Sequence, residues 1–439
     1  MISGAMPHGP GFCPQSSRTS GGNGLLSGRR KRDRVWTSVS LHRQPLGALF
    51  LLDGSPVGGW ALSDTHLTLD LLHDDLTTLA GRQGVFVTLG EVLLRDMPAD
   101  NERLERTRQV WVALAGTEFN LAVMLSRLGV PCTFVTRAPA NPYGWLLRNV
   151  AREQGLNVDH FVWAGPAEPM GRLLYELGRT PRPGVAWYQR MYSAASRLGP
   201  GMVDWPAALK ETRLLHAAGI SFGLSAHSGY ERNYVLECFQ EALAARPAGC
   251  RVGLDFNYRS TLWSPEQCKA TLTPLVAGHV DILVTTVEDL TRFYGLRCEA
   301  PGADGRLSDG ALQGLLQQAI ADFQLQIVAV TLRYADSYEA HRWESAALDA
   351  AGHFARSRAV RPMVLWDRLG GGDAWTAGFY YGLLTEPDPA RALQKGILVG
   401  DAATRLKQTL MFDLPIVSRQ DVQALLEADE AGGATRTVR

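Results

Sequence analysis

The 439-residue sequence has no uninterrupted run of 18 apolar residues, which excludes a transmembrane helix of ordinary length. It also has no excess charge of either sign, because Lys and Arg together number 44 and Asp and Glu together also number 44. Proteins that coat nucleic acid or bind anionic membranes need a clear cationic excess. We therefore expect neither nucleic acid nor a membrane among the partners of this chain.

Cysteine and lysine are scarce. The six cysteines form no C-x-x-C pair and have no accompanying cluster of histidines, so neither a zinc site nor a disulfide framework is expected. We expect reduced thiols and a cytoplasmic location. Only five of the 44 basic residues are lysine, so a site for phosphate or carboxylate is expected to use arginine.

The first 80 residues differ in composition from the rest. Residues 1–28 are rich in Gly, Ser and Pro without a hydrophobic period, so we expect residues 1–80 to be a disordered N-terminal extension. The basic run at 29–34 raises a targeting signal as an alternative, but the apolar stretch Leu46–Leu52 after it is short and ends at Asp53, which disfavours that reading. A mis-assigned start codon is a third interpretation.

From Val85 onward, apolar β-branched stretches alternate with stretches of helical spacing. The predicted strands are 85–91, 132–136, 214–218, 251–256, 281–285 and 327–332, and the predicted helices are 117–129, 142–155, 230–245, 265–277, 309–323, 372–384 and 389–410. This alternation predicts an α/β fold with a doubly wound, mostly parallel sheet and helices on both faces. Two extended stretches without helices, 105–115 and 170–193, predict a small separate sheet.

Three consecutive glycines, Gly370, Gly371 and Gly372, precede a helical pattern, and Asp373 follows them. Glycines at a helix N-terminus let backbone N–H groups converge on an anion. A carboxylate beside such an anion hole can take a proton from a hydroxyl while the amides stabilise a transferring phosphoryl group. The pattern equally fits a glycine-rich turn with an N-capping Asp, and locally both interpretations stay open. The chain has neither a P-loop motif nor a dinucleotide-binding glycine fingerprint after the first strand.

The stretch G-G-G-D-A-W followed by A-G-F-Y-Y-G-L-L resembles the C-terminal signature of the ribokinase-like (pfkB) carbohydrate kinases. The resemblance covers most of residues 85–428 and is greatest to the 2-keto-3-deoxygluconate kinases. It rests also on V-T-L-G-E-V-L-L-R from Val87, G-T-E-F-N-L-A from Gly116, R-P-G-V-A-W-Y-Q-R from Arg182 and L-D-F-N-Y-R from Leu254.

The resemblance implies a ribokinase-like domain at 85–428, with a β-sheet lid from about 92–116 and 170–193 and a C-terminal tail at 429–439. It implies ATP-dependent phosphorylation of 2-keto-3-deoxygluconate to its 6-phosphate, with Mg²⁺. Asp373 is then the general base, and the amides of Gly370–Asp373 form the anion hole. The exposed edges of a lid sheet favour a homodimer formed through the lid.

The resemblance also implies a set of binding residues. Tyr188 and Arg190 lie two positions apart, so on a strand they share a face, where a phenol suits hydroxyls and a guanidinium suits the carboxylate of a sugar acid. The residues implied for the substrate are Gly116, Asn120, Tyr188, Arg190, Asn257 and Arg259. Those implied for the nucleotide are Thr331, Arg333, Lys407 and Thr409, and Mg²⁺ is expected near Glu288 and Asp289, largely through water.

Two alternatives remain. One is another kinase of the same family, acting on fructose, ribose or 5-dehydro-2-deoxygluconate. The other is a non-catalytic member that binds a sugar acid without turnover. The second is motivated by departures from the family pattern: Ala115 stands in place of a glycine and Thr286 in place of an asparagine, while Leu173 and Gln408 replace an aromatic residue and a histidine.

Overall fold

The computed structural model describes residues 76, 79, 82 and 84–431, all within one compact unit of the chain. The N-terminal extension expected at 1–80 lies outside the described residues up to position 75, as does the tail from position 432. Leu79 is buried in the apolar core, and Leu76 packs against the same core. None of the helices in the described ranges is both long and apolar enough to cross a membrane.

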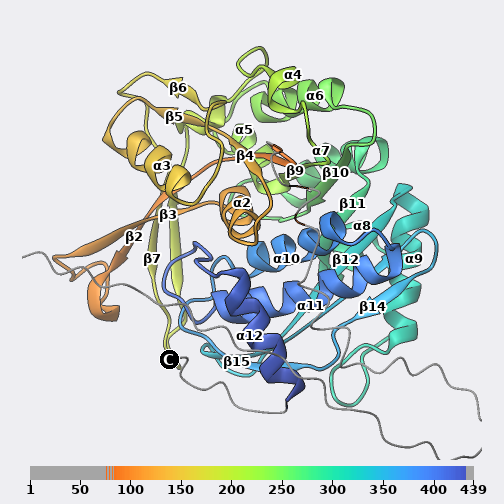
Figure 1. Cartoon of the computed structure of the whole chain (residues 1–439). Coiled ribbons are helices and arrows are strands. Elements are labelled where there is room, and N and C mark those ends of the chain that lie inside the picture. Colours follow the sequence, from red (N-terminus) through yellow and green to blue (C-terminus); the bar gives the residue numbers. More distant parts are fainter. Residues whose placement is uncertain (1–75, 77–78, 80–81, 83, 432–439) are drawn as a thin grey trace, which may run out of the picture. The chain divides into compact units, whose positions relative to one another are not determined.

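A nine-stranded sheet forms the centre of the described part of the chain (Figure 1). Its order is β14-β13-β12-β11-β10-β9-β1-β4, with β15 also paired to β13. The strands are β1 (Phe86–Leu89), β4 (Cys132–Val135), β9 (Leu214–Ala218), β10 (Arg251–Asp255), β11 (Ile282–Thr286), β12 (Ile327–Ala335), β13 (Ala340–Asp349), β14 (Phe354–Arg356) and β15 (Arg361–Val364). The pairs from β4 to β12 are parallel, and β13 is antiparallel to its three neighbours. The predicted mostly parallel sheet is confirmed.

Helices cover both faces of this sheet, as predicted. One core contains α2 (Thr117–Arg127), α3 (Pro142–Glu153), α10 (Gly371–Thr385), α11 (Pro389–Lys407) and α12 (Arg419–Glu430). The other contains α4 (Trp205–Ala208), α5 (Gly219–His227), α6 (Tyr234–Ala245), α7 (Pro265–His279), α8 (Val287–Tyr294) and α9 (Asp309–Phe323). Successive strand residues divide between the two cores, Phe86 to the first and Val87 to the second. This alternation explains why the buried strands are continuously apolar.

Several elements differ from the sequence-based expectation. Helix α6 begins at Tyr234 and not at 230, because the side chain of Asn233 caps it by accepting from the amide of Leu236. Helix α5 was not predicted, because its glycines and serines have low helix propensity and it forms by burial against the sheet. The antiparallel strands β13, β14 and β15 were also not predicted.

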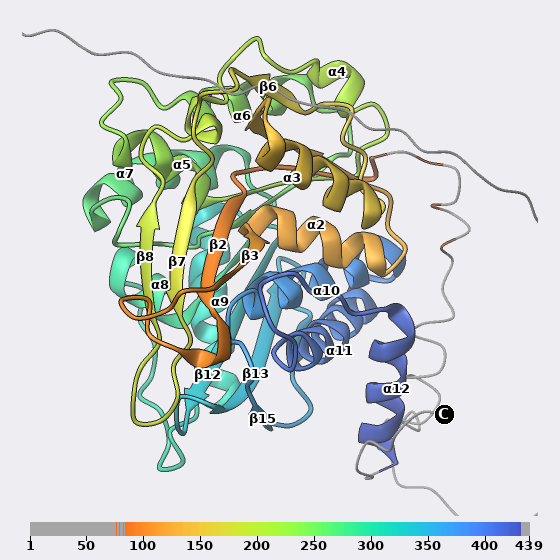
Figure 2. The same ribbon diagram turned by 90° about the vertical axis from the view of Figure 1, so that its left-hand side faces the viewer.

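The small sheet lies against the edge of this core (Figure 2). Its order is β3-β2-β7-β8, built from β2 (Leu93–Pro98), β3 (Val110–Ala115), β7 (Arg172–Glu176) and β8 (Val185–Gln189). A further two-stranded sheet pairs β5 (Arg137–Pro139) with β6 (Val162–Ala164). The inner face of the four-stranded sheet carries an apolar cluster that includes Leu93 and Tyr175 and packs against Leu369 and Phe412. The sheet is therefore fastened to the loop that precedes α10.

Candidate active site

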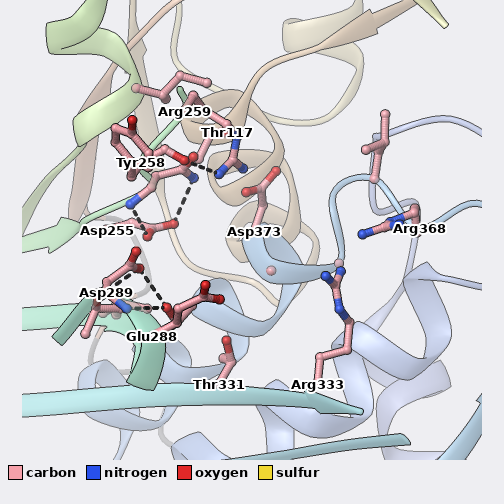
Figure 3. Close-up of a pocket in the computed structure, with 18 of the residues that line it drawn as sticks. Thr117, Asp255, Tyr258, Arg259, Glu288, Asp289, Thr331, Arg333, Arg368 and Asp373 are labelled. Carbon is pink, nitrogen blue, oxygen red and sulfur yellow. Dashed lines mark hydrogen bonds between the residues drawn. The ribbon is translucent and has the colours of Figure 1, made fainter. Parts of the chain in front are cut away.

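A cavity of about 1170 Å³ lies where the carboxyl ends of β10, β11 and β12 meet the start of α10 and the inner face of the small sheet. Open α/β sheets bind their ligands at this edge. The lining contains most of the residues predicted from the sequence, namely Gly116, Asn120, Tyr188, Arg190, Asn257, Arg259, Glu288, Asp289, Thr331, Arg333, Gly370, Gly371, Gly372 and Asp373. Figure 3 shows Asp373 between carboxylates on one side and two arginines on the other.

The glycine turn before α10 is shaped by close backbone contacts. Gly370 has a φ of 77° and caps the helix, and a Cβ on it would overlap the carbonyl oxygen of Asp413. A Cβ on Gly371 would overlap the side chain of Gln408, whereas one on Gly372 would meet nothing. The amides of the first turn have no carbonyl partner within the helix. The open side of Gly372 therefore lets an anion approach these amides closely.

Asp373 is buried in the first turn of α10 and is held by one neighbour. The Nδ2 group of Asn120, in the first turn of α2, donates to its Oδ2 at 2.7 Å. Burial raises the pKa of Asp373 to about 7, and the charges of Asp255 and Asp413 act in the same direction. The bond from Asn120 and the charge of Arg259 oppose this rise. A carboxyl group with this pKa can exchange a proton near neutral pH.

A second buried carboxyl group, Glu118, lies beside Asp373 and was not predicted. It accepts from the Ser221 hydroxyl at 2.5 Å and from the Ala218 amide at 3.2 Å. Burial raises the pKa of Glu118 to about 8, so it is largely neutral at pH 7. It joins α2 to the start of α5 and thereby helps to fix the position of Asn120 two residues later.

The predicted substrate side has fewer free cations than expected. The guanidinium of Arg190 is buried and binds Glu91 through Nε at 2.8 Å and Nη2 at 2.5 Å. Glu91 also accepts from the hydroxyl of Ser193. Arg190 packs over the ring of Tyr188 at 5.6 Å. Its charge is therefore already balanced, while Arg259 donates only to the carbonyl of Tyr258, at 2.9 Å, and has no carboxylate partner within the described ranges.

Two buried amide oxygens face this side without partners. Within the described part of the chain, neither Oδ1 of Asn120 nor Oδ1 of Asn257 has a hydrogen-bond donor. Asn257 sits in a turn with a φ of 40°, and Asp255 fixes that turn by accepting from its amide and its Nδ2 at 3.1 Å each. Buried acceptors without donors are costly, and hydroxyl groups of a ligand would satisfy them.

The carboxylates of the cavity are spread out. Asp289 accepts from the hydroxyl of Thr286 at 2.8 Å, and burial raises its pKa. Glu288 is largely exposed and pairs with Arg292 at 3.3 Å. Within residues 84–431 and the three described positions before them, no group of three metal-ligating side chains comes together. This arrangement fits Mg²⁺ held mainly by water and phosphate oxygens with one or two carboxylates, such as Asp289 and Asp255.

The predicted nucleotide residues separate into two groups. Thr331 and Arg333 lie on β12 and line the cavity. Lys407 and Thr409 do not line it. Lys407 ends α11 fully buried, and its Nζ donates to the backbone carbonyl of Asp367 at 3.2 Å. Thr409 is exposed and donates to the carbonyl of Leu406.

A buried ion cluster packs next to the glycine turn. It was not predicted from the sequence. Arg95 on β2 binds Asp413 at 2.5 Å and Asp367 at 2.6 Å. Asp367 further accepts from the amides of Leu369 and Phe412 at 3.1 Å each. The guanidinium packs over the ring of Tyr175 at 4.4 Å. Arg95 thus joins the small sheet to both segments that shape the start of α10.

Comparison with known proteins agrees with this architecture. The family model of the pfkB family carbohydrate kinases matches residues 86–415. The chain therefore belongs to the pfkB family of carbohydrate kinases, which confirms the resemblance seen in the sequence. It is an enzyme of the carbohydrate kinase class.

Three similar proteins illustrate its relationships within this class. The chain is 29% identical over 350 residues to the 2-dehydro-3-deoxygalactonokinase of Haloferax volcanii, covering 79% of this chain and 98% of that protein. The 2-dehydro-3-deoxygluconokinase of Thermotoga maritima has a similar structure, with a TM-score of 0.69 and 27% identity over 79% of this chain and 99% of that one. A fructokinase with bound ATP from Xylella fastidiosa has the same fold, with a TM-score of 0.58 and 17% identity over 79% and 98% of the two chains.

Proposed function

We propose that this carbohydrate kinase transfers the γ-phosphoryl group of ATP to the primary hydroxyl of a 2-keto-3-deoxy sugar acid, with 2-keto-3-deoxygluconate as the preferred substrate. The observation that carries the proposal is Asp373, a buried carboxyl with a pKa raised to about 7 in the first turn of α10. Because ATP is the donor, we also propose that the enzyme works in the cytoplasm.

Each step of the proposed reaction is assigned to particular residues of the chain. Asn120 holds Oδ2 of Asp373, which orients the carboxylate toward the substrate hydroxyl. The hydroxyl oxygen bonds to the γ-phosphorus as its proton passes to Asp373, and the bond from that phosphorus to the β–γ bridging oxygen breaks, so that its electron pair leaves with ADP. The amides of Gly370–Asp373 stabilise the charge that develops on the phosphoryl oxygens. Asp289 and Asp255 would hold Mg²⁺ largely through water, and the ion would supply positive charge beside the phosphate oxygens.

An acidic sugar is supported by one arginine of the substrate side. Arg259 has no carboxylate partner among the described residues, so its charge is available to a ligand carboxylate. The names of the similar proteins from Haloferax volcanii and Thermotoga maritima, both 2-keto-3-deoxy sugar acid kinases, point to the same class of substrate.

A substrate panel tests the proposal. Coupled ADP-release assays are expected to show kcat/KM values for 2-keto-3-deoxygluconate or its galactonate epimer about 100-fold above those for fructose and ribose, since loss of the charge-assisted bond between Arg259 and the carboxylate costs roughly 1.5–3 kcal/mol. The Arg259→Met variant should raise KM for the acid and so reduce its advantage over the neutral sugars, while KM for ATP changes little. Equal turnover of acidic and neutral sugars contradicts the substrate assignment, and thermal stabilisation by the acid without ADP release supports a non-catalytic member.

We further propose that the protein forms a homodimer through the outer face of the small sheet. Val112, Leu174 and Trp187 lie in one lateral row on that face, with Asp96 between Val112 and Leu174. Asp96 is buried and neutralised by Arg172 at 2.6 Å, whereas Val112 and Trp187 are 44% and 46% exposed. Apolar side chains gathered on one exposed sheet face favour burial against a second copy.

Trp187→Glu is expected to convert the dimer to a monomer, as measured by light scattering or sedimentation, because it places a charge in an apolar interface. Trp145→Glu, on the exposed side of α3 outside the small sheet, serves as the matched control and should leave the dimer intact. A wild-type protein that is monomeric at micromolar concentration excludes the proposed interface.

A further inference from the structure

Besides Arg259, two further arginines of the cavity have no carboxylate partner in the described part of the chain. Arg333 lies near the end of β12, and Arg368 precedes the glycine turn by two residues. Both line the cavity. Neither has an ion pair or a hydrogen bond within residues 84–431, and Arg368 only packs over the ring of Tyr338 at 5.8 Å. Other arginines near this edge, such as Arg95 and Arg190, have carboxylate partners.

The two guanidinium groups repel each other. The pKa of Arg333 is lowered by burial and by the positive charges of Arg368 and Arg259. The same positive charges act on the neighbouring imidazole of His341. Burial, together with the charges of Arg333 and Arg368, lowers the pKa of His341 to about 4. Like charges held together without a counter-charge cost folding free energy. An anion bound between the two guanidinium groups offsets this cost.

The position of the pair indicates which anion. Figure 3 shows Arg333 and Arg368 extending toward each other from β12 and from the loop before α10, with Asp373 beyond them. The carboxylates of Asp255, Glu288 and Asp289 lie on the opposite side of the cavity (Figure 3). The phosphoryl group that is transferred must lie beside Asp373 and the first amides of α10. The two guanidiniums border that same space.

We infer that Arg333 and Arg368 form a two-guanidinium clamp that binds the β- and γ-phosphates of the nucleotide. This inference rests on the proposed use of ATP at this cavity. Planar guanidiniums bind phosphate through paired N–H donors, so the clamp holds the polyphosphate end of the nucleotide and discriminates ATP and ADP from AMP. It also balances the charge that moves to the β-phosphate when ADP leaves. Arg368 is a binding residue that the sequence motifs alone did not indicate.

Equilibrium binding tests the clamp without requiring turnover. Dissociation constants for inorganic triphosphate, ADP and AMP are measured by calorimetry for the wild type, Arg333→Met, Arg368→Met and the double variant. Each single variant is expected to bind triphosphate and ADP roughly 10–100-fold more weakly, while binding of AMP changes little. Arg342→Met is the matched control, because Arg342 pairs with Asp336 outside the cavity, and its affinities should equal those of the wild type.

A second readout separates ligand binding from a structural role. Removing either guanidinium relieves repulsion, so ligand-free Arg333→Met and Arg368→Met are expected to melt at or above the wild-type temperature. Variants that bind triphosphate and ADP within threefold of the wild type overturn the clamp, as do variants that melt well below it with unchanged affinity. If the wild type binds triphosphate and ATP through these arginines but releases no ADP with any sugar acid, the proposed function fails while the clamp stands. If the wild type binds no polyphosphate, both fail.

Discussion

Asp373→Asn is expected to lower kcat by roughly 10²–10⁴-fold, the usual contribution of a general base. The asparagine side chain has the same shape and keeps a neighbour for Asn120, but its amide cannot take a proton from the substrate hydroxyl. The KM values for the sugar acid and ATP should stay within about threefold, because the interaction lost is made in the transition state. ADP release measured with saturating substrates reports the loss.

The stability of this variant provides the control. The pKa of Asp373 in the folded protein, about 7, lies above its usual value of 3.8. Ionisation of Asp373 is therefore disfavoured in the folded state. The loss of folding stability that this causes grows as pH rises from 3.8 toward about 7 and is fully present above pH 7. Asp373→Asn should thus be at least as stable as the wild type at pH 8 in urea unfolding. A variant that loses activity and stability together would show that Asp373 is needed for folding, and one that keeps near-full kcat would remove it from the mechanism.

Arg95→Met is expected to lower the free energy of unfolding by about 3–5 kcal/mol, since it removes the ion-pair partner of two buried carboxylates and leaves them only the charge of Lys407. Arg95 is fully buried, and both of its ion pairs, with Asp367 and Asp413, lie in the interior. Burial already raises the pKa of Asp413 despite the charge of Arg95. The destabilisation should therefore shrink as pH falls, because the Asp413 carboxylate left behind becomes protonated. Urea unfolding at pH 8 and pH 5 measures both effects.

A matched surface variant shows whether burial is the cause. Arg232 pairs with Glu237 at an exposed position, and Arg232→Met should change stability far less than Arg95→Met. Arg95→Lys keeps the charge but not the paired geometry, and an intermediate loss is expected. If Arg95→Met is as stable as the wild type at pH 8, the ion cluster does not hold the small sheet to the glycine turn.

Much of the central sheet could be predicted, because its elements carry strong local signals. Strand β9 and helix α9 have the boundaries expected from the sequence, and Ser308 caps α9 as its side chain suggests. The glycine turn and Asp373 were predictable for the same reason, since glycines before an apolar helical pattern are a local feature. Elements whose stability comes from tertiary packing, such as α5, escaped this kind of prediction.

The electrostatics of the site depend on contacts between distant positions. Arg95 is 272 positions from Asp367 and 318 from Asp413, so no spacing rule connects them. Glu91 neutralises Arg190, although the two residues are 99 positions apart in the sequence. From the sequence alone, that arginine was expected to be a free cation. Lys407 was predicted to face the nucleotide, but burial turns it toward the backbone of Asp367. Charge compensation of this kind follows from the packed structure and not from the local pattern.

The pH dependence of kcat/KM for the sugar acid, measured from pH 5 to pH 9, is the direct test of Asp373 as the general base. We expect activity to rise with pH, with an apparent pKa near 7, because only the ionised form of Asp373 accepts the hydroxyl proton. Neighbouring carboxyls, Asp255 with a pKa raised to about 6 and Glu118 with a pKa raised to about 8, share in the apparent value. The residual activity of Asp373→Asn should lack this rise. A wild-type rate that is flat from pH 6 to pH 8, or a rise that persists unchanged in Asp373→Asn, would contradict the assignment of Asp373 as the base.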